Sequence, residues 1–320
     1  MFKKAIKSFF SVLVLTSLVL GITLTVKGIS DLNEKKIVGL ASKIGMEGQV
    51  AGLFSKRSVK DLVLQVSSTI NLGATPENNI VNKKEILFKI AIIADSENDY
   101  DNLNKALEKV KTLNVYEVVH LGDLTEWGDV GSMMKIKEYL DNSKLNYVTI
   151  PGDHDLAESV GNKDVTGLAN FTQVYGDNFH ILNTNGMKIV ILDNSANYTP
   201  ISNTLVEWFK AQVVNADFVM LSQPLYHPTN SRAMGIVDGE PTPVVVAQAL
   251  LLLDMIRKSN VKAIIAADQH ISSENADPVK SDLKHIVVGA LTKARNLQTP
   301  RFSLMTVYND KSFTTEDVIL

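Results

Sequence analysis

The sequence predicts an α/β domain from Ile86 to the C-terminus, on the strength of two patterns. Short runs rich in β-branched residues alternate with amphipathic helical stretches, which is typical of α/β folds. Acidic residues and histidines recur directly after these runs, where open α/β sheets place their ligands. With 320 residues, 45% of them apolar, the chain is long enough to bury a full core in one large domain or two smaller ones.

The N-terminus predicts a membrane segment. Three lysines, Lys3, Lys4 and Lys7, precede the uncharged stretch 9–26, which would span about 27 Å as a helix, close to the hydrocarbon thickness. By the positive-inside rule we expect a single-pass anchor with its N-terminus in the cytoplasm and the rest exported. A cleaved secretory signal is the alternative, but no alanine suited to a cleavage site lies between Ala5 and Ala41.

Three segments follow from this organisation. Residues 1–27 form the anchor or uncleaved signal, residues 28–85 a polar-amphipathic stalk or helical collar, and residues 86–320 the α/β domain. Apolar runs bounded by turn residues predict nine strands in that domain, and apolar residues at helical spacing predict four helices. The strands are 86–94, 117–121, 147–150, 179–182, 188–192, 218–221, 261–266, 285–288 and 303–308, and the helices are 101–113, 131–142, 204–214 and 244–258.

The composition restricts the chemistry. Because the chain has no cysteine, it has no thiol nucleophile, no disulfide and no cysteine-ligated zinc, so a metal would need carboxylate, imidazole, amide or hydroxyl ligands. The net charge of −3 argues against a broad basic face, and we expect no nucleic-acid partner.

Acidic side chains follow several successive strands. One Asp after a strand is typically a helix N-cap, and we interpret Asp193 as structural. Acidic residues after several strands need another explanation, because carboxylates gathered at one sheet edge repel one another unless a cation lies among them. We therefore expect one or two divalent metal ions in a site for phosphoryl hydrolysis. The residues that recur in this way are Asp95, Asp123, Asp153 with His154, and Asp268 with His270.

Five sequence blocks, in order, carry a family resemblance. They read ADSEN at 94–98, GDLTEWG at 122–128, PGDHD at 151–155, LSQPLYHP at 221–228 and ADQH at 267–270. Over residues 86–310 the chain resembles the calcineurin-like metallophosphoesterase superfamily. The resemblance implies a four-layer αββα sandwich of two mixed sheets with helices outside. It also implies metal-dependent hydrolysis of a phosphomonoester or phosphodiester.

The resemblance also implies roles for matching residues. Asp95 and His270 would bind the first of two metal ions, and Asp123 would bridge both. His154 would contact the phosphate and protonate the leaving group, and Asp155 would orient the His154 ring.

Four positions depart from the family pattern. Glu97, Asp153 and Asp268 stand where it has His, Asn and His, and we retain all three as metal ligands. Ser222 replaces a lone His, although His227 lies nearby. Up to five carboxylates would favour Mn²⁺, Mg²⁺ or Ca²⁺ over Zn²⁺ or Fe²⁺, and would also oppose the approach of a phosphate anion.

These departures leave two functions open. The first is a membrane-tethered, extracytoplasmic phosphoesterase with reduced activity, acting on a phosphorylated small molecule or a cell-envelope component. The second is a catalytically inactive binding module of the same fold at the cell envelope. We further expect the loop 228–243 to cover the site, with Arg232 as a phosphate contact.

Overall fold

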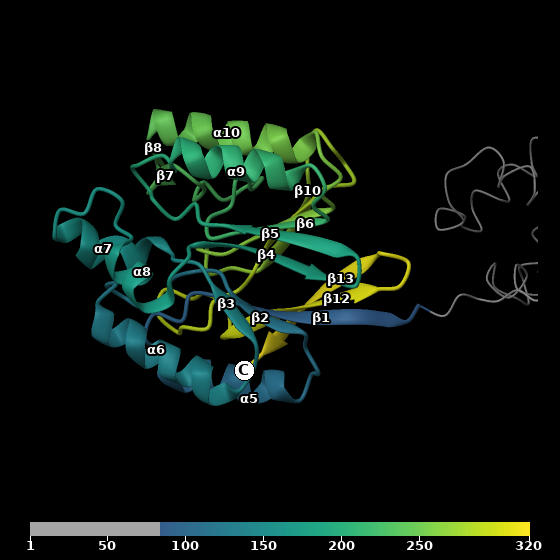
Figure 1. Ribbon diagram of the computed structural model, residues 1–320, viewed down its shortest axis with the longest axis horizontal. Coiled ribbons are helices and arrows are strands. Elements are labelled where there is room, and N and C mark those ends of the chain that lie inside the picture. Colours follow the sequence, from purple (N-terminus) through teal and green to yellow (C-terminus); the bar gives the residue numbers. More distant parts are fainter. Residues whose placement is uncertain (1–83) are drawn as a thin grey trace, which may run out of the picture. The chain divides into compact units, whose positions relative to one another are not determined.

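Two mixed β-sheets lie face to face in residues 84–320, the part of the chain that the computed structural model describes (Figure 1). The first has the order β13 (Phe313–Ile319), β12 (Arg301–Tyr308), β1 (Ile86–Ile93), β2 (Glu117–His120) and β3 (Tyr147–Thr149). The second has the order β10 (Ser273–Ala276), β11 (Lys284–Val287), β9 (Ala263–Ala266), β6 (Phe218–Leu221), β5 (Met187–Leu192) and β4 (Phe179–Thr184).

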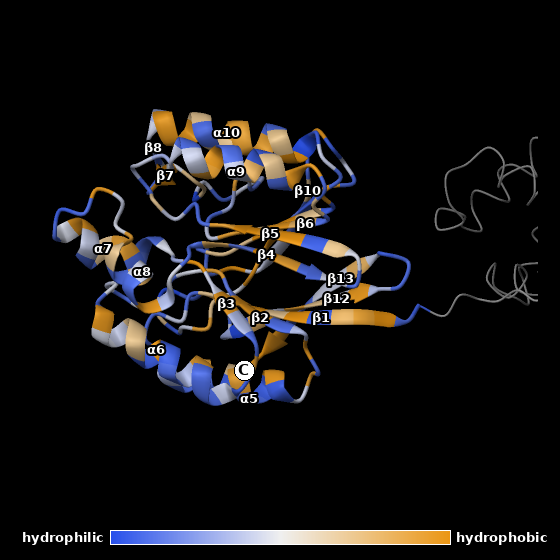
Figure 2. Cartoon of the chain, in the orientation of Figure 1, coloured by the Kyte–Doolittle hydropathy of each residue, from blue (hydrophilic) through white to orange (hydrophobic). Residues whose placement is uncertain are grey.

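Apolar side chains from both sheets form the central core. Buried residues of β1, β2, β5, β6 and β9 meet there, among them Ile92, Val119, Ile191, Met220 and Ile265. Figure 2 shows these strands as predominantly hydrophobic ribbons, in contrast to the mixed surfaces of the helices. Burial of both faces accounts for the continuous apolar runs of the parallel strands.

Helices cover the outer face of each sheet. An apolar cluster joins the first sheet to α5 (Tyr100–Lys111), α6 (Val130–Ser143) and α8 (Ala169–Tyr175). A further cluster joins the second sheet to α9 (Asn203–Val213) and α10 (Pro243–Arg257). The order of layers is therefore helix, sheet, sheet, helix, as the resemblance implied (Figure 1).

All predicted strands and helices are present, with small shifts at their ends. The structure adds α7 (Asp153–Gly161), α8, β10, β13 and the short ribbon of β7 (Ile236–Val237) and β8 (Glu240–Pro241). Strands β10 and β13 alternate between half-buried and exposed residues and carry many polar side chains, so they lack the apolar runs by which we recognised the others.

The compact unit begins at Lys84. The expected membrane segment at 9–26 and the expected stalk up to residue 83 lie outside the described residues. Within residues 84–320, every helix is too short or too polar to cross a bilayer.

The topology brings the ends of the central strands to one edge. Strands β1, β2 and β3 are parallel to one another, as are β5, β6, β9 and β11. Backbone hydrogen bonds then join the loops that follow them: Asp95 N donates to Gly122 O at 3.0 Å, and Ala267 N donates to Ser222 O at 2.9 Å. The polar residues after different strands are thereby held at fixed positions.

Candidate metal centre

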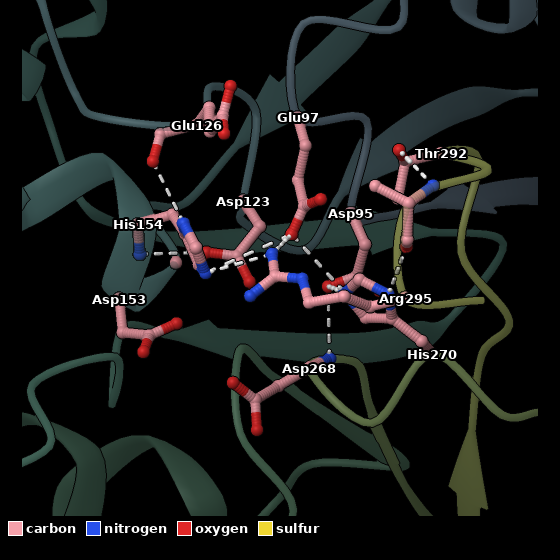
Figure 3. Close-up of polar contacts among 12 residues, drawn as sticks. Asp95, Glu97, Asp123, Glu126, Asp153, His154, Asp268, His270, Thr292 and Arg295 are labelled. Atoms are coloured by element: carbon pink, nitrogen blue, oxygen red, sulfur yellow. Dashed lines mark hydrogen bonds and ion pairs between the residues drawn. The ribbon is translucent and has the colours of Figure 1, made fainter.

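The loops after β1, β2 and β9 adopt an unusual backbone conformation at the residues predicted to form the site. Five non-glycine residues there have positive φ values, namely Asp95 (49°), Glu97 (41°), Asp123 (52°), Asp268 (71°) and His270 (55°). Such conformations cost free energy and gather at functional sites, where the surrounding structure enforces them. Here they turn carboxylates and an imidazole toward a common centre (Figure 3).

Two glycines allow the loops after β2 and β3 to pack against each other. A Cβ atom on Gly152 would lie 2.0 Å from Asp123 Oδ1, and one on Gly122, at φ +100°, would lie 2.6 Å from Gly152 N. The close approach lets His154 N donate to Asp123 Oδ1 at 3.0 Å. The glycines of the GD and PGDHD blocks therefore fix the position of the central carboxylate.

Asp95, Asp123 and His270 form the first of three possible ligand groups. Each offers an atom within 4.8 Å of the others, and all three side chains are buried. The Nδ1 atom of His270 donates to Ala294 O at 3.2 Å, which leaves Nε2 directed at the carboxylates, 3.8 Å from Asp95 Oδ1. We call these three residues the first group.

The electrostatics of the first group favour a bound cation. Asp95 Oδ2 is buried and has no hydrogen-bond partner among residues 84–320. Burial raises the pKa of Asp95 to about 7, and burial together with Asp153 and Asp95 raises the pKa of Asp123 well above its usual value. A divalent ion would satisfy the free oxygen and stabilise the ionised carboxylates, so these residues fit a metal.

Asp123, Asp153 and Asp268 form the second group, again with ligand atoms within 4.8 Å of one another. Arg232 binds two of these side chains. Its Nε and Nη2 atoms donate to the two oxygens of Asp268 at 2.7 Å, and Nη2 also donates to Asp153 Oδ2 at 2.9 Å. Burial opposes ionisation of Asp153, but Arg232, His154 and Asn197 together outweigh it and lower the pKa of that carboxyl.

Glu97, Asp123 and His154 form the third group. The Glu97 carboxylate contacts the Arg295 guanidinium and lies 3.4 Å from His270 Nε2. Although burial opposes it, hydrogen bonding from His270 lowers the pKa of Glu97. The Arg295 side chain is 58% exposed, so it lies at the opening of the site.

His154 faces this opening through one ring nitrogen. Its Nδ1 atom donates to Glu126 O at 2.9 Å, and Nε2 lies 3.1 Å from Arg295 Nη2, from which it can accept (Figure 3). The backbone carbonyl of Glu126 thus sets the orientation of the ring.

The expected role of Asp155 is wrong. Its carboxylate does not contact the His154 ring, because it is fully buried and accepts instead from the backbone N–H groups of Gly152 (2.9 Å), Leu124 (3.0 Å) and Thr125 (2.9 Å). Asp155 joins the loops after β2 and β3. Its effect on His154 is therefore indirect.

The structure gathers the six predicted ligands and His154 at one sheet edge, while their roles remain predictions. It does not bring His227 into any of the three groups. The Nδ1 atom of His227 accepts from Thr229 N and Asn230 N, at 3.2 and 2.8 Å, and Nε2 pairs with Ser273 Oγ at 3.1 Å. The expected phosphate contact, Arg232, is instead paired with carboxylates.

Two contributors were absent from the sequence prediction. Arg295 reaches the site from the segment after β11, and Asn197 donates to Asp153 Oδ2 at 2.6 Å. Neither stands in a motif, and only the long-range packing of the two sheets brings them to the acidic residues.

Comparison with known proteins agrees with this architecture. A family described as calcineurin-like phosphoesterase matches residues 88–272. A dimetal phosphatase from Danio rerio is 14% identical over 73% of this chain and 96% of that one, with a TM-score of 0.52. A purple acid phosphatase from yellow lupin seeds is 10% identical over 72% of this chain and 51% of its own, with a TM-score of 0.55. At such identities the likeness concerns the fold alone. No curated protein sequence gives a significant match.

Proposed function

Because the chain belongs to the calcineurin-like phosphoesterase family, we propose that it hydrolyses a phosphomonoester or phosphodiester with a bound divalent metal ion. The observation that carries the proposal is the buried first group, in which one Asp95 oxygen has no partner among residues 84–320. A structural cluster would pair that oxygen, whereas a cation-binding cluster leaves it available.

The residues of the first group would hold the ion. Asp95 and Asp123 offer carboxylate oxygens and His270 offers Nε2, with Glu97 3.4 Å from that nitrogen. The ion supplies Lewis-acid chemistry, which polarises the phosphoryl group and lowers the pKa of water. Together with Glu97, the first group offers three carboxylates and one imidazole, a donor set that favours Mn²⁺, Mg²⁺ or Ca²⁺ over Zn²⁺ or Fe²⁺.

Two side chains at the opening would act on the phosphate. The exposed Arg295 guanidinium is suited to bidentate contact with a phosphoryl oxygen pair, and its positive charge counters the repulsion by the carboxylates. His154 directs Nε2 to the same place and, when protonated there, can give its proton to the leaving oxygen. For that step Arg295 must release Nε2, which a bound phosphate would favour by taking over its N–H donors.

We expected two ions, and the second group already contains a cation, the Arg232 guanidinium. The proposal therefore requires a metal only at the first group.

The test is an activity assay on the full chain. Metal is removed with a chelator, and hydrolysis of an aryl phosphate and a bis-aryl phosphate is measured with Mn²⁺, Mg²⁺, Ca²⁺, Zn²⁺ and Fe²⁺ in turn. We expect turnover with at least one ion, highest with Mn²⁺ or Mg²⁺. If folded protein showed no turnover with any of these ions, the inactive binding module would replace the enzyme; the pairing of both arginines with carboxylates is the observation that favours that alternative.

We also propose that the domain is tethered outside the cytoplasm by residues 9–26 and acts on a phosphorylated small molecule or envelope component. The support is the sequence pattern of lysines and apolar residues. Membrane fractionation of cells, followed by protease treatment of intact cells or spheroplasts, tests it. Recovery in the cytosolic fraction would contradict the tether.

A further inference from the structure

We propose that Arg232 is the permanent cation of the second group, so that the domain binds one divalent metal ion and not two. The inference rests on the proposed metal binding at the first group, but it does not depend on turnover. Arg232 then acts as a positioning residue that holds Asp153 and Asp268 in place.

The hydrogen bonds leave the second group few free oxygens. Both oxygens of Asp268 accept from Arg232 at 2.7 Å. Asp153 Oδ2 accepts from Arg232 at 2.9 Å and from Asn197 at 2.6 Å, and Asp153 Oδ1 has no partner among residues 84–320. A metal ion at this group would have to share the oxygens of Asp268 with the guanidinium or break the bidentate pair.

Burial makes that exchange unfavourable. The Asp268 side chain is only 3% exposed, and its partner guanidinium carries its charge at every physiological pH. Removing one member of a buried ion pair leaves the other charge buried and unpaired, which is strongly unfavourable. A divalent ion placed beside a guanidinium that stayed would be repelled by its positive charge.

The backbone holds Arg232 in this place. Its N–H donates to Asn230 Oδ1 at 3.0 Å, and its carbonyl accepts from Gln269 Nε2 at 2.5 Å. Gln269 follows Asp268 directly, so the same loop that carries the carboxylate also anchors the arginine. The segment is further fixed by pairing between Ala233 and Ile236.

Arg295 provides the contrast within the same site. Its side chain is 58% exposed, against 25% for Arg232, and among the carboxylates of residues 84–320 it contacts only Glu97. Arg295 is therefore free to turn toward a phosphate, whereas Arg232 is not. Arg232 therefore balances the negative charge of Asp153 and Asp268, whereas Arg295 is available to the substrate.

The experiment counts metal ions on the full chain. Chelator-treated protein is titrated with Mn²⁺ by calorimetry, and the electron paramagnetic resonance spectrum is recorded at saturation. We expect the wild-type chain to bind one Mn²⁺ with the spectrum of an isolated ion. Arg232→Met, which removes the charge but keeps much of the side-chain volume, frees both carboxylates and should bind a second Mn²⁺, with the spectrum of an exchange-coupled pair.

Arg295→Met is the matched control and should still bind one ion. The inference is overturned if the wild-type chain binds two ions, or if folded, saturated Arg232→Met still binds one. Should Arg232→Met fail to fold, the wild-type count decides. Two ions with turnover would refute the inference and leave the proposed function intact, whereas one ion without turnover would support the inference and refute hydrolysis.

Discussion

Residues 84–320 contain two buried ionic clusters that differ in how completely they are paired. One cluster, far from the ligand groups in the sequence, is centred on Asp277, which directly follows β10. Arg257 Nε donates to its Oδ1 at 3.0 Å, His285 Nε2 pairs with its Oδ2 at 2.8 Å, and the backbone N–H groups of Val279 and Lys280 donate at 2.8 Å. Every oxygen of this carboxylate has partners.

The metal centre is the opposite case. In the first group, Asp95 Oδ2 is buried without a partner among the described residues. Burial opposes ionisation of Asp277, but Arg257, His285 and the two backbone N–H groups together outweigh it and lower its pKa, whereas burial raises the pKa of Asp95 to about 7. A satisfied cluster stabilises the fold by itself, and an unsatisfied one needs a cation from solution. The predictions below test this difference.

The largest effect is expected from Asp123→Asn. Asp123 belongs to all three ligand groups, so its loss should abolish Mn²⁺ binding and reduce turnover on the order of 10³-fold, about 4 kcal/mol of transition-state stabilisation. Removing one of several repelling charges should not lower the stability of the metal-free protein. Calorimetric titration, activity assays and chemical denaturation together measure this, and unimpaired Mn²⁺ binding would show that Asp123 is not a ligand.

Asp277→Asn should show the reverse pattern. Breaking the pairs with Arg257 and His285 should lower the free energy of unfolding by about 3–5 kcal/mol, without changing the number of Mn²⁺ ions bound. Asp254→Asn, at an exposed pair with Lys258, is the control and should cost less than about 1 kcal/mol.

The lowered pKa of Asp277 also predicts that the stability of the protein decreases in acid. Because the folded-state pKa of Asp277 lies below its unfolded value of about 3.9, its contribution is complete above about pH 5 and is lost as the pH falls. The gap in the free energy of unfolding between wild type and Asp277→Asn should narrow as the pH falls from 7 to 3, measured by chemical denaturation. A constant gap between them would contradict the assigned pairing.

Gly152→Ala should weaken the metal centre through backbone packing. The added Cβ would lie 2.0 Å from Asp123 Oδ1, so that carboxylate must move, and we expect Mn²⁺ affinity to fall about tenfold or more. Gly161→Ala, at the end of α7 where the added atom meets nothing within 4 Å, is the control. Equal affinity in both variants would mean that the close approach does not position Asp123.

The smallest effect concerns Glu117, at the start of β2. Burial raises its pKa to about 7, so its contribution to stability is present below the unfolded value of about 4.3 and is lost as the pH rises through 7. Glu117→Gln should therefore stabilise the protein at pH 8, by about 1 kcal/mol because the carboxyl is still partly hydrated. Equal stability of the two proteins at pH 8 would show that Glu117 is better solvated than its position indicates.

Much of the fold and the membership of the acidic cluster could be predicted from local patterns. Buried parallel strands such as β1 and β9 have continuous apolar runs, and the acidic residues stand directly after them. The topology then places Asp95, Asp123 and Asp268 at one edge, because ends of parallel strands coincide.

The pairing of those residues could not be predicted in the same way. Arg232 and Arg295 approach from segments far away in the sequence, and no local spacing indicates which carboxylate each would bind. The role of Asp155 was mistaken because adjacency in the sequence suggested contact with His154, whereas the first turn of α7 directs the carboxylate inward. Side-chain partners depend on tertiary packing, which periodicity does not encode.

The central claim is that the first group takes a divalent ion. The most direct test is a crystal of the full chain or of its folded domain grown with Mn²⁺ and measured at a wavelength where manganese scatters anomalously. We expect an anomalous peak within bonding distance of Asp95, Asp123 and His270. A map with no peak at these three residues, from protein saturated with Mn²⁺, would contradict it.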